Sequence, residues 1–153
     1  MVLVLVGGGG EETRIRRLVL SMSLTDRVIF TGFLENPARL YPAFDLYVAA
    51  SLKEGLPLSV VEAMGAGLAV VATDVPGHRD VVVHGETGLL VPLDDAAALT
   101  DSIVSLMSDP SRRKAMGEAG RRRANSAFAV RPMVEATAQV YRQAAASAER
   151  RPR

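Results

Sequence analysis

The feature that most constrains the fold is the alternation of short apolar runs with amphipathic segments along the chain. Most of the apolar runs lack a regular in/out alternation of apolar and polar residues, which is typical of strands buried on both faces. The first run, in "MVLVLVGGGG", is expected to be a buried strand that begins near Met1. The five predicted strands are Val2–Val6, Arg27–Thr31, Leu46–Ala50, Ala69–Thr73 and Leu89–Val91.

The segments between and after these runs place apolar residues at helical spacing. The clearest sets are Ile15, Leu18, Val19 and Met22; Leu99, Ile103, Leu106 and Met107; and Met133, Val140, Tyr141 and Ala144. Alternating strands and helices predict a parallel, doubly wound α/β sheet with helices on both faces, which binds ligands beyond the carboxyl ends of its strands. After Pro92 the pattern is mainly helical. We therefore expect an α/β domain at residues 1–128, followed by a C-terminal helix and basic tail at residues 129–153.

Composition excludes several classes of protein. With 153 residues, 48% of them hydrophobic, the chain suits a globular domain, and no apolar run is long enough to cross a bilayer. Cysteine is absent, which excludes a disulfide framework and a thiolate metal site and favours a cytoplasmic location. A net charge of +1 gives no general attraction to nucleic acid. We interpret Arg121–Arg123 as a solvated helix face and "ERRPR" as a frayed tail; the alternative is contact with anionic lipid at the inner membrane surface.

A glycine-rich loop follows the first predicted strand. Gly7 and Gly9 fit the start of a dinucleotide fingerprint, but its third glycine would fall at Glu12, or at Thr13 if counted from Gly8. The spacing therefore disfavours a dinucleotide-dependent oxidoreductase. Two interpretations of the loop stay open: a turn that needs positive φ, or a bare backbone that approaches a ligand.

The third strand leads into a turn and then a helix start. Pro57 suits the first turn of a helix, which we expect to run from about Leu58 to Ala66 and to stop at Gly67. The first amide groups of that helix, near Leu58, Ser59 and Val60, would lack intrahelical acceptors and would face the positive end of the helix dipole. This arrangement predicts a phosphate site.

Two glutamates flank the predicted phosphate site. A carboxylate beside bound phosphate is repelled by it, so Glu54 and Glu62 must point toward neutral donors, such as the hydroxyls of a sugar. The order sugar, diphosphate, ribose follows, with Glu54 at one end and Glu62 at the other. The alternative is that Glu54 only favours the helix dipole and that Glu62 is an exposed helical residue.

The stretch "EGLPLSVVEAMGAGLAVVATDVPG" resembles the E-x(7)-E signature of retaining glycosyltransferases with the GT-B fold, in the large family four. The segments "VLVLVGGGGEE", "DRVIFTGFL", "LYPAFDLYVAAS" and "GHRDVVVHGETGLLVPLDD" resemble the family in the same order. The resemblance implies a Rossmann-like sheet of about five strands, the C-terminal half of a GT-B enzyme without its opening strand and helix. That absent segment carries the family's arginine and lysine for the leaving diphosphate, and the N-terminal half carries the acceptor site.

The resemblance also implies residue roles. Glu54 would contact the transferred sugar and act as the catalytic carboxylate, and Glu62 would hold the ribose. The donor-binding residues implied around them are Gly55, Leu56, Pro57, Leu58 and Ser59 at the sugar and diphosphate, Gly32 and Phe33 at the base, and Gly7, Gly8 and Gly9 on the floor of the cleft. Gly8 and Gly10 stand where the family usually has an acidic residue and a proline, and Asp80 stands where it usually has glutamate.

The implied reaction transfers a hexose from a UDP-, GDP- or ADP-sugar to a hydroxyl, with retention, without metal or other cofactor. We expect the chain to be inactive alone, and a second copy of it to cover the sheet edge left open. His78 and His84 are interpreted as exposed loop residues, with a position in the cleft as the alternative for His78. Two further alternatives stay open: a nucleotide-sugar binding or interaction module without catalysis, and an epimerase-like protein.

Overall fold

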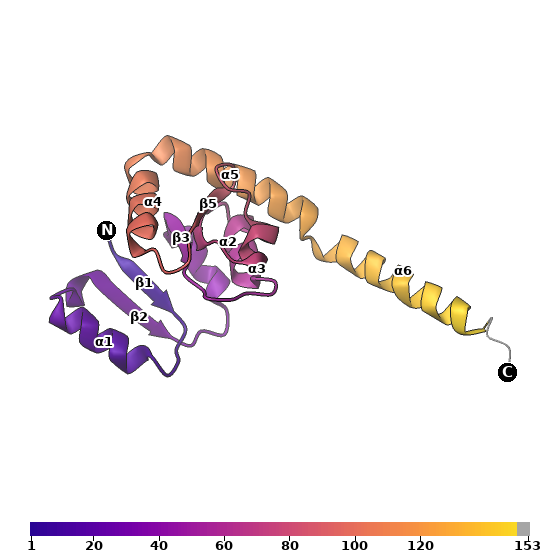
Figure 1. Ribbon diagram of the computed structural model, residues 1–153, viewed down its shortest axis with the longest axis horizontal. Helices are drawn as coiled ribbons and strands as arrows, with labels where there is room; N and C mark the ends of the chain where they lie inside the picture. The colour runs from indigo at the N-terminus through magenta and orange to yellow at the C-terminus, as the bar shows by residue number, and fades with distance from the viewer. Residues whose placement is uncertain (150–153) are drawn as a thin grey trace. The chain divides into compact units, whose positions relative to one another are not determined.

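The computed structural model describes residues 1–149, and the chain divides into two compact units, Met1–Leu40 and Tyr41–Arg153. We call them the N-terminal unit and the C-terminal unit (Figure 1). The basic tail expected after Glu149 lies outside the described residues. None of the helices within residues 1–149 has both the length and the apolar character needed to cross a membrane.

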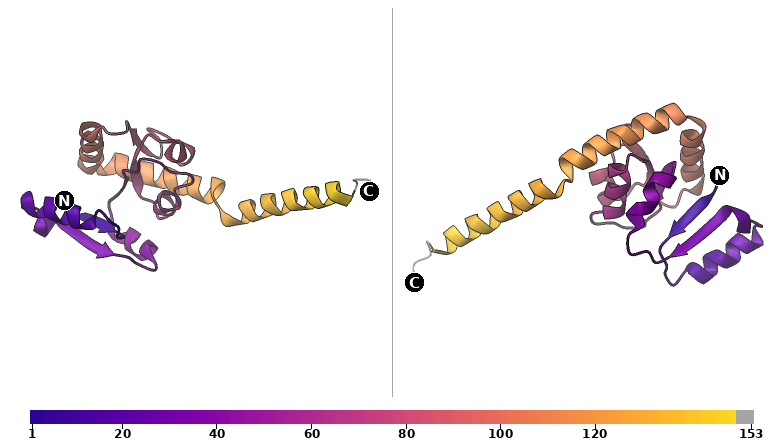
Figure 2. Two further views of the ribbon diagram at one scale, coloured as in Figure 1. Left: turned by 60° about the horizontal axis from the view of Figure 1, so that its bottom comes forward. Right: turned by 180° about the vertical axis from the view of Figure 1, so that it is seen from behind.

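The N-terminal unit is a strand–helix–strand element. Its parts are β1 (Leu3–Val6), α1 (Glu12–Ser21), a short 3₁₀ helix η1 (Thr25–Arg27) and β2 (Val28–Gly32). The two strands are parallel, with Leu3 opposite Val28, and α1 lies alongside them (Figure 2). The guanidinium of Arg16 on α1 lies 4.1 Å from the centre of the Phe30 ring on β2, which ties the helix to the sheet.

Strand β1 is less buried than its sequence predicted. Leu3 and Val6 are 47% and 43% exposed, and only Val4 and Leu5 are half-buried. Within the described residues β1 pairs with β2 alone, so one of its edges has no partner strand. The prediction of a buried first strand was therefore wrong. Apolar composition shows that a strand can be buried, but the elements that pack against it decide how much of it is buried.

The C-terminal unit holds the other three strands and most of the helices. Its elements are β3 (Leu46–Ala49), α2 (Leu58–Gly65), β4 (Ala69–Thr73), α3 (Pro76–Val81), β5 (Gly88–Val91), α4 (Ala96–Ser108), α5 (Pro110–Ala127) and α6 (Val130–Glu149). The 3₁₀ helix η2 (Pro37–Ala43) begins in the N-terminal unit and ends in the C-terminal unit. The sheet order is β3-β4-β5 and both pairings are parallel. All five predicted strands are present within one residue of their expected bounds, divided between a two-stranded and a three-stranded sheet.

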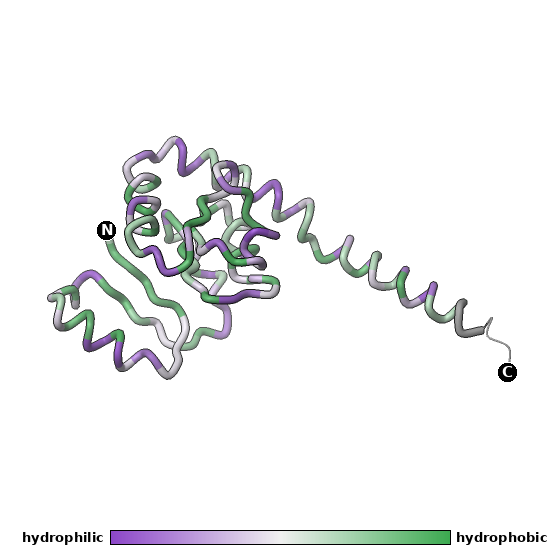
Figure 3. Tube along the Cα trace, in the orientation of Figure 1, coloured by the Kyte–Doolittle hydropathy of each residue, from purple (hydrophilic) through white to green (hydrophobic). Residues whose placement is uncertain are grey.

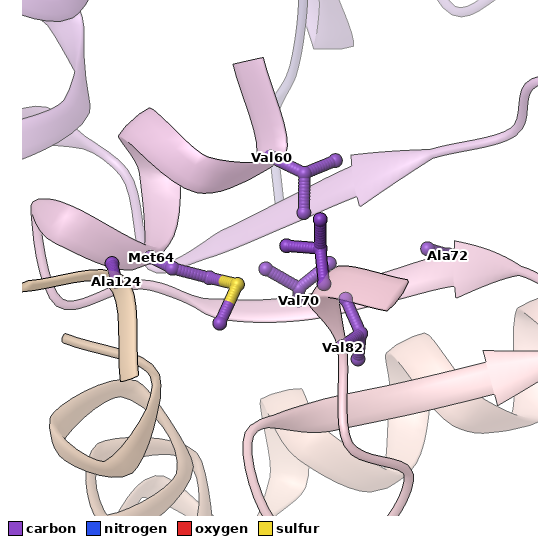
Figure 4. Close-up of a cluster of buried hydrophobic side chains, with 7 residues drawn as sticks. Val60, Met64, Val70, Ala72, Val82 and Ala124 are labelled. Atoms are coloured by element: carbon purple, nitrogen blue, oxygen red, sulfur yellow. The ribbon is translucent and has the colours of Figure 1, made fainter. Parts of the chain in front are cut away.

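Strand β4 is the centre of the core. All five of its residues are buried, as the prediction of two covered faces requires. Val70 and Ala72 pack on one face with Val60 and Met64 of α2 (Figure 4). On the other face, Ala69 and Val71 pack in a cluster with two buried helix residues, Leu106 of α4 and Met116 of α5.

The three C-terminal helices confirm the helical layer and tail that the sequence predicted. Leu106 is fully buried, whereas the apolar residues of α6 stay exposed, among them Met133 at 60% and Tyr141 at 73%. Apolar and polar residues alternate along α6 (Figure 3).

Arg121 and Arg122 are exposed, as expected. Arg123 differs, because its guanidinium donates to the carbonyl oxygens of Val81 and Asp80 at 2.7 and 2.8 Å and so binds the C-terminal end of α3.

Candidate functional site

The turn between β3 and α2 carries the residues singled out by the sequence. Strand β3 ends at Ala49, and α2 begins at Leu58. Pro57 is the buried N-cap residue, with φ −76° and ψ 85°, one position before the first helical residue. The ring costs the helix nothing there, because an amide at that position would have no intrahelical acceptor.

The amide groups of this turn are available to a ligand. Within the described residues, the N–H groups of Gly55, Leu56, Leu58 and Ser59 have no hydrogen-bond acceptor, and α2 has no side-chain cap. All four residues are exposed. The prediction was wrong for Val60, whose amide donates to the carbonyl of Pro57 at 3.0 Å and whose side chain is fully buried. The donor set therefore ends at Ser59, because the helix begins its own hydrogen bonding one residue later.

The two carboxylates flank these amides. The side chain of Glu54 is half-buried and makes no ion pair within the described residues. Glu62 is exposed, and its Oε2 accepts a hydrogen bond of 3.1 Å from the hydroxyl of Tyr41. The Glu62 carboxylate is thus held by Tyr41 through Oε2 while the residue stays exposed to solvent. Its position is therefore more restricted than that of a surface glutamate without a hydrogen-bond partner.

Helix α3 packs against the backbone of the turn at Glu54 and Gly55. A β-carbon built on Gly77 would lie 2.4 Å from the carbonyl oxygen of Gly55 and 2.7 Å from that of Glu54. Real side chains do not approach a carbonyl oxygen so closely, so only glycine allows this contact. Because the two carbonyls are packed against α3, the backbone of the Glu54–Gly55 turn has little freedom to move toward that helix.

Thr73, the last residue of β4, fixes the start of the same turn. Its hydroxyl donates to the carbonyl of Ser51 at 2.6 Å. The backbone carbonyl of Thr73 lies 2.7 Å from Nδ1 of His78. A carbonyl oxygen only accepts, so His78 carries its proton on Nδ1. The end of β4, the start of α3 and the turn before Glu54 are therefore one hydrogen-bonded assembly.

The two histidines differ in burial. His84 is exposed, as expected, and its Nδ1 accepts from the amide of Leu90 at 3.0 Å. His78 was expected in an exposed loop, but it lies on α3 and is fully buried, with no partner for Nε2 in the described part of the chain. The Pro76–Gly77 pair suggested a loop from sequence, whereas Pro76 begins α3 instead.

The glycine-rich loop and the turn after β2 meet in the N-terminal unit. The amide of Gly7, which has φ +106°, donates to the carbonyl of Gly32 at 3.0 Å, and Gly32 has φ +65°. Gly7 therefore meets the first interpretation of the loop, a turn that needs positive φ. Gly8 and Gly9 are exposed, and Phe33 is 86% exposed.

Three supporting residues were missed from the sequence: Tyr41, Thr73 and Gly77. Each acts through a partner distant in the chain, as when Tyr41 contacts Glu62 across 21 positions. No spacing rule connects such pairs. The only signal was that Thr73 ends the buried run Ala69–Thr73 and that Gly77 follows it closely, at the end of the strand where ligand sites of parallel sheets form.

Comparison with known proteins assigns the chain to a family. The family model described as "Glycosyl transferases group 1" matches residues 1–123. The chain is 34% identical over 139 residues to N-acetyl-alpha-D-glucosaminyl L-malate synthase of Bacillus anthracis, covering 91% of this chain and 36% of that protein. It is 37% identical over 132 residues to the lipopolysaccharide core biosynthesis mannosyltransferase LpsB of Rhizobium meliloti, covering 85% of this chain and 38% of the relative.

Solved structures superpose on most of this chain. Sucrose-phosphate synthase from Thermosynechococcus elongatus superposes with a TM-score of 0.89 at 38% identity, covering 95% of this chain and 39% of that one. Anabaena Alr3699/HepE in complex with UDP gives a TM-score of 0.85 at 27% identity, covering 93% and 41%. The chain thus spans about two-fifths of the length of these relatives. The chain belongs to the glycosyl transferases group 1 family, and it corresponds to the C-terminal part of a GT-B fold.

Proposed function

We propose that this chain is the donor-binding half of a glycosyltransferase that transfers a hexose from a nucleoside-diphosphate sugar to a hydroxyl acceptor with retention. The observation that carries the proposal is the set of exposed, unpaired amides from Gly55 to Ser59 between Glu54 and Glu62. Such amides at a helix start favour a phosphate group, and flanking carboxylates favour neutral hydroxyls.

Each part of the site has one task in this proposal. The amides and the positive end of α2 bind the diphosphate and stabilise the charge that develops on it as the bond to the sugar breaks. Glu54 accepts hydrogen bonds from the sugar and orients it for departure. Glu62 accepts from the ribose hydroxyls. The acceptor oxygen forms the new bond to the sugar carbon as the bond from that carbon to the diphosphate oxygen breaks, and the proton of the acceptor hydroxyl passes to the departing nucleoside diphosphate.

The comparisons support the class of donor. Structures of HepE, 27% and 26% identical to this chain, were solved with UDP and with UDP and glucose. Binding of a uridine nucleotide-sugar by this chain follows by analogy. Gly7, Gly8, Gly9, Gly32 and Phe33 keep their predicted roles at the cleft floor and the base as part of the proposal.

The proposed donor site works without metal, because the amides at the start of α2 supply the positive potential that binds the diphosphate. Affinity for the nucleoside diphosphate that survives chelation with EDTA supports this, and loss of that affinity contradicts it. The acceptor site lies in an N-terminal half of the kind that the relatives possess. The location is cytoplasmic, with contact at the inner membrane surface as the alternative, which cell fractionation distinguishes.

Calorimetry tests donor binding. The purified chain is titrated with UDP, GDP, ADP and NAD. We expect one nucleoside diphosphate to bind, and Glu62→Ala to weaken it roughly tenfold or more, because hydrogen bonds to a charged group are worth about 1.5–3 kcal/mol. Glu118→Ala is the matched control, since Glu118 is an exposed glutamate on α5. Binding of NAD alone, or of no nucleoside diphosphate, contradicts the proposal.

A transfer assay separates the whole enzyme from its binding half. No residue of this sequence matches the arginine and lysine that the family uses against the leaving diphosphate. We therefore expect binding without turnover, and sugar transfer by the purified chain would refute this part of the proposal. Binding without turnover even when an N-terminal half from a relative is supplied would instead favour a binding module.

A further inference from the structure

Tyr41 occupies a rigid position beside the helix that carries Glu62. It lies in η2, is 5% exposed and belongs to a buried cluster with Ala63 and Leu68. Its ring meets Phe44 and Tyr47 edge-on, with ring centres 6.5 and 6.1 Å apart. A ring packed in this way holds its hydroxyl at a fixed point.

That hydroxyl lies between two acceptors on α2. It is 3.1 Å from Oε2 of Glu62 and 3.4 Å from the carbonyl oxygen of Ser59. A phenol has one proton to donate, and the carboxylate is both closer and charged, so Glu62 is the better acceptor. Burial, together with the hydrogen bond to Glu62, raises the pKa of the Tyr41 hydroxyl above its ordinary value, which keeps it a donor.

The contact constrains a side chain that would otherwise be mobile. Glu62 is exposed, and Tyr41 is its hydrogen-bond partner in the described residues. A free glutamate loses rotamer entropy when it binds a ligand, and a side chain already held in place loses less. With Oε2 bound to Tyr41, Oε1 remains open to a ligand.

We propose that Tyr41 is a positioning residue that holds the Glu62 carboxylate in place for the ribose hydroxyls of a bound nucleoside diphosphate. This inference rests on the proposed function of Glu62. It goes further by assigning to a buried tyrosine, outside the glutamate signature, a part of the affinity for the ribose.

The test compares two ligands on one set of variants. Wild type, Tyr41→Phe, Glu62→Ala and the double variant are titrated with the nucleoside diphosphate that binds wild type and with its 2′,3′-dideoxy form. Tyr41→Phe keeps the ring and removes only the hydroxyl. Tyr47→Phe is the matched control, because Tyr47 belongs to the same aromatic cluster and makes no bond to Glu62. Melting temperature is followed for every variant as a measure of folding.

We expect Tyr41→Phe to weaken the ribose-containing ligand roughly three- to tenfold, the range of one ordinary hydrogen bond. Affinity for the dideoxy ligand should stay unchanged, and Tyr41→Phe should have no further effect once Glu62 is alanine. Tyr47→Phe should bind both ligands as wild type does.

Two results would overturn the inference alone, and a third would overturn it together with the proposed function. An unchanged affinity in Tyr41→Phe means that the hydroxyl does not position Glu62. An equal loss for both ligands means that Tyr41 acts through the fold rather than through the ribose. If wild type binds a nucleoside diphosphate and Glu62→Ala weakens it, the proposed function stands even when Tyr41→Phe has no effect. If wild type binds none, both proposals fail together.

Discussion

Gly77 and Gly55 are in backbone contact: a β-carbon on Gly77 would come within 2.4 Å of the carbonyl oxygen of Gly55. The contact joins the first turn of α3 to the turn that follows Glu54. It makes the geometry of the candidate sugar site dependent on a residue that touches no ligand.

Gly77→Ala is expected to damage both the fold and the site. The added methyl group meets backbone atoms that cannot rotate away, so α3 or the Glu54 turn must move, at a cost of about 1–3 kcal/mol in the free energy of unfolding. Urea denaturation measures the stability, and calorimetry with a nucleoside diphosphate measures the site. Gly65→Ala is the control, because a β-carbon there meets nothing within 4 Å and alanine favours the helix. Equal stability and affinity in the two variants would contradict the contact.

Thr73→Val removes a hydroxyl without changing the shape of the side chain much. The carbonyl of Ser51 then loses a donor at 2.6 Å, and we expect about 1–3 kcal/mol of destabilisation together with weaker donor binding. Thermal unfolding and calorimetry test the two effects separately. Thr100→Val, at an exposed position of α4, is the control and should leave donor affinity unchanged. A Thr73→Val variant that binds as wild type would show that this hydroxyl does not fix the turn.

The Asp74–Arg79 pair predicts a pH dependence of stability. Arg79 donates to Asp74 through Nε at 2.6 Å and Nη2 at 3.2 Å, and this hydrogen bonding lowers the pKa of Asp74. The stabilisation is present above the unfolded pKa of about 3.9 and is lost as the pH falls through the lower folded pKa.

Asp74→Asn should therefore be slightly less stable than wild type at pH 7, and the two should converge as the pH falls below the lowered pKa of Asp74 in the folded protein. Urea denaturation across this range measures the difference, which is small because both side chains are partly exposed. Asp101→Asn, at an exposed aspartate on α4, serves as the control. A constant difference between Asp74→Asn and wild type at all pH values would show that ionisation of Asp74 is not responsible.

Leu106→Ala tests the packing of α4 on the sheet. Leu106 is fully buried beside Val71 of β4, so its truncation should cost about 2–5 kcal/mol of unfolding free energy. Val104→Ala on the same helix should cost far less, because Val104 is 53% exposed. Chemical denaturation of the two variants decides the matter, and a similar loss in both would place α4 away from the core.

The open strand edges predict self-association. Among the described residues, β1 pairs only with β2, and β3 pairs only with β4. Unpaired edges favour addition of a further strand. We expect light scattering to give a mass near twice the 16.3 kDa of one chain at micromolar concentration. A mass of one chain at every concentration would exclude a second copy as the partner.

The parts of the fold that sequence predicted are those governed by local patterns. Runs such as Ala69–Thr73 and Leu46–Ala49 are β-branched or apolar enough to be recognised as strands from the local sequence, and Pro57 marks the start of α2 without reference to distant residues. The exposed amides of Leu58 and Ser59 follow from a local rule as well, since a helix start leaves its first donors unpaired.

Apart from the Val60 amide, which bonds locally to the carbonyl of Pro57, the errors and omissions depend on packing against other elements. The exposure of Leu3 and Val6 depends on which strands pair with β1, and the burial of His78 depends on α3 packing under the turn. The roles of Tyr41 and Gly77 arise from contacts across many residues of chain. Periodicity and composition describe one segment at a time, so they cannot identify such partners.

Strand β4 ends at Thr73, and the turn before Glu54 is anchored to that residue by a single hydrogen bond. Repacking the interior around β4 is thus expected to displace this turn by fractions of an ångström, while every residue of the candidate donor site keeps its identity. Substitutions at buried positions would then change donor preference. Mutant libraries restricted to the exposed residues of the site would miss the substitutions with the largest effect on that preference.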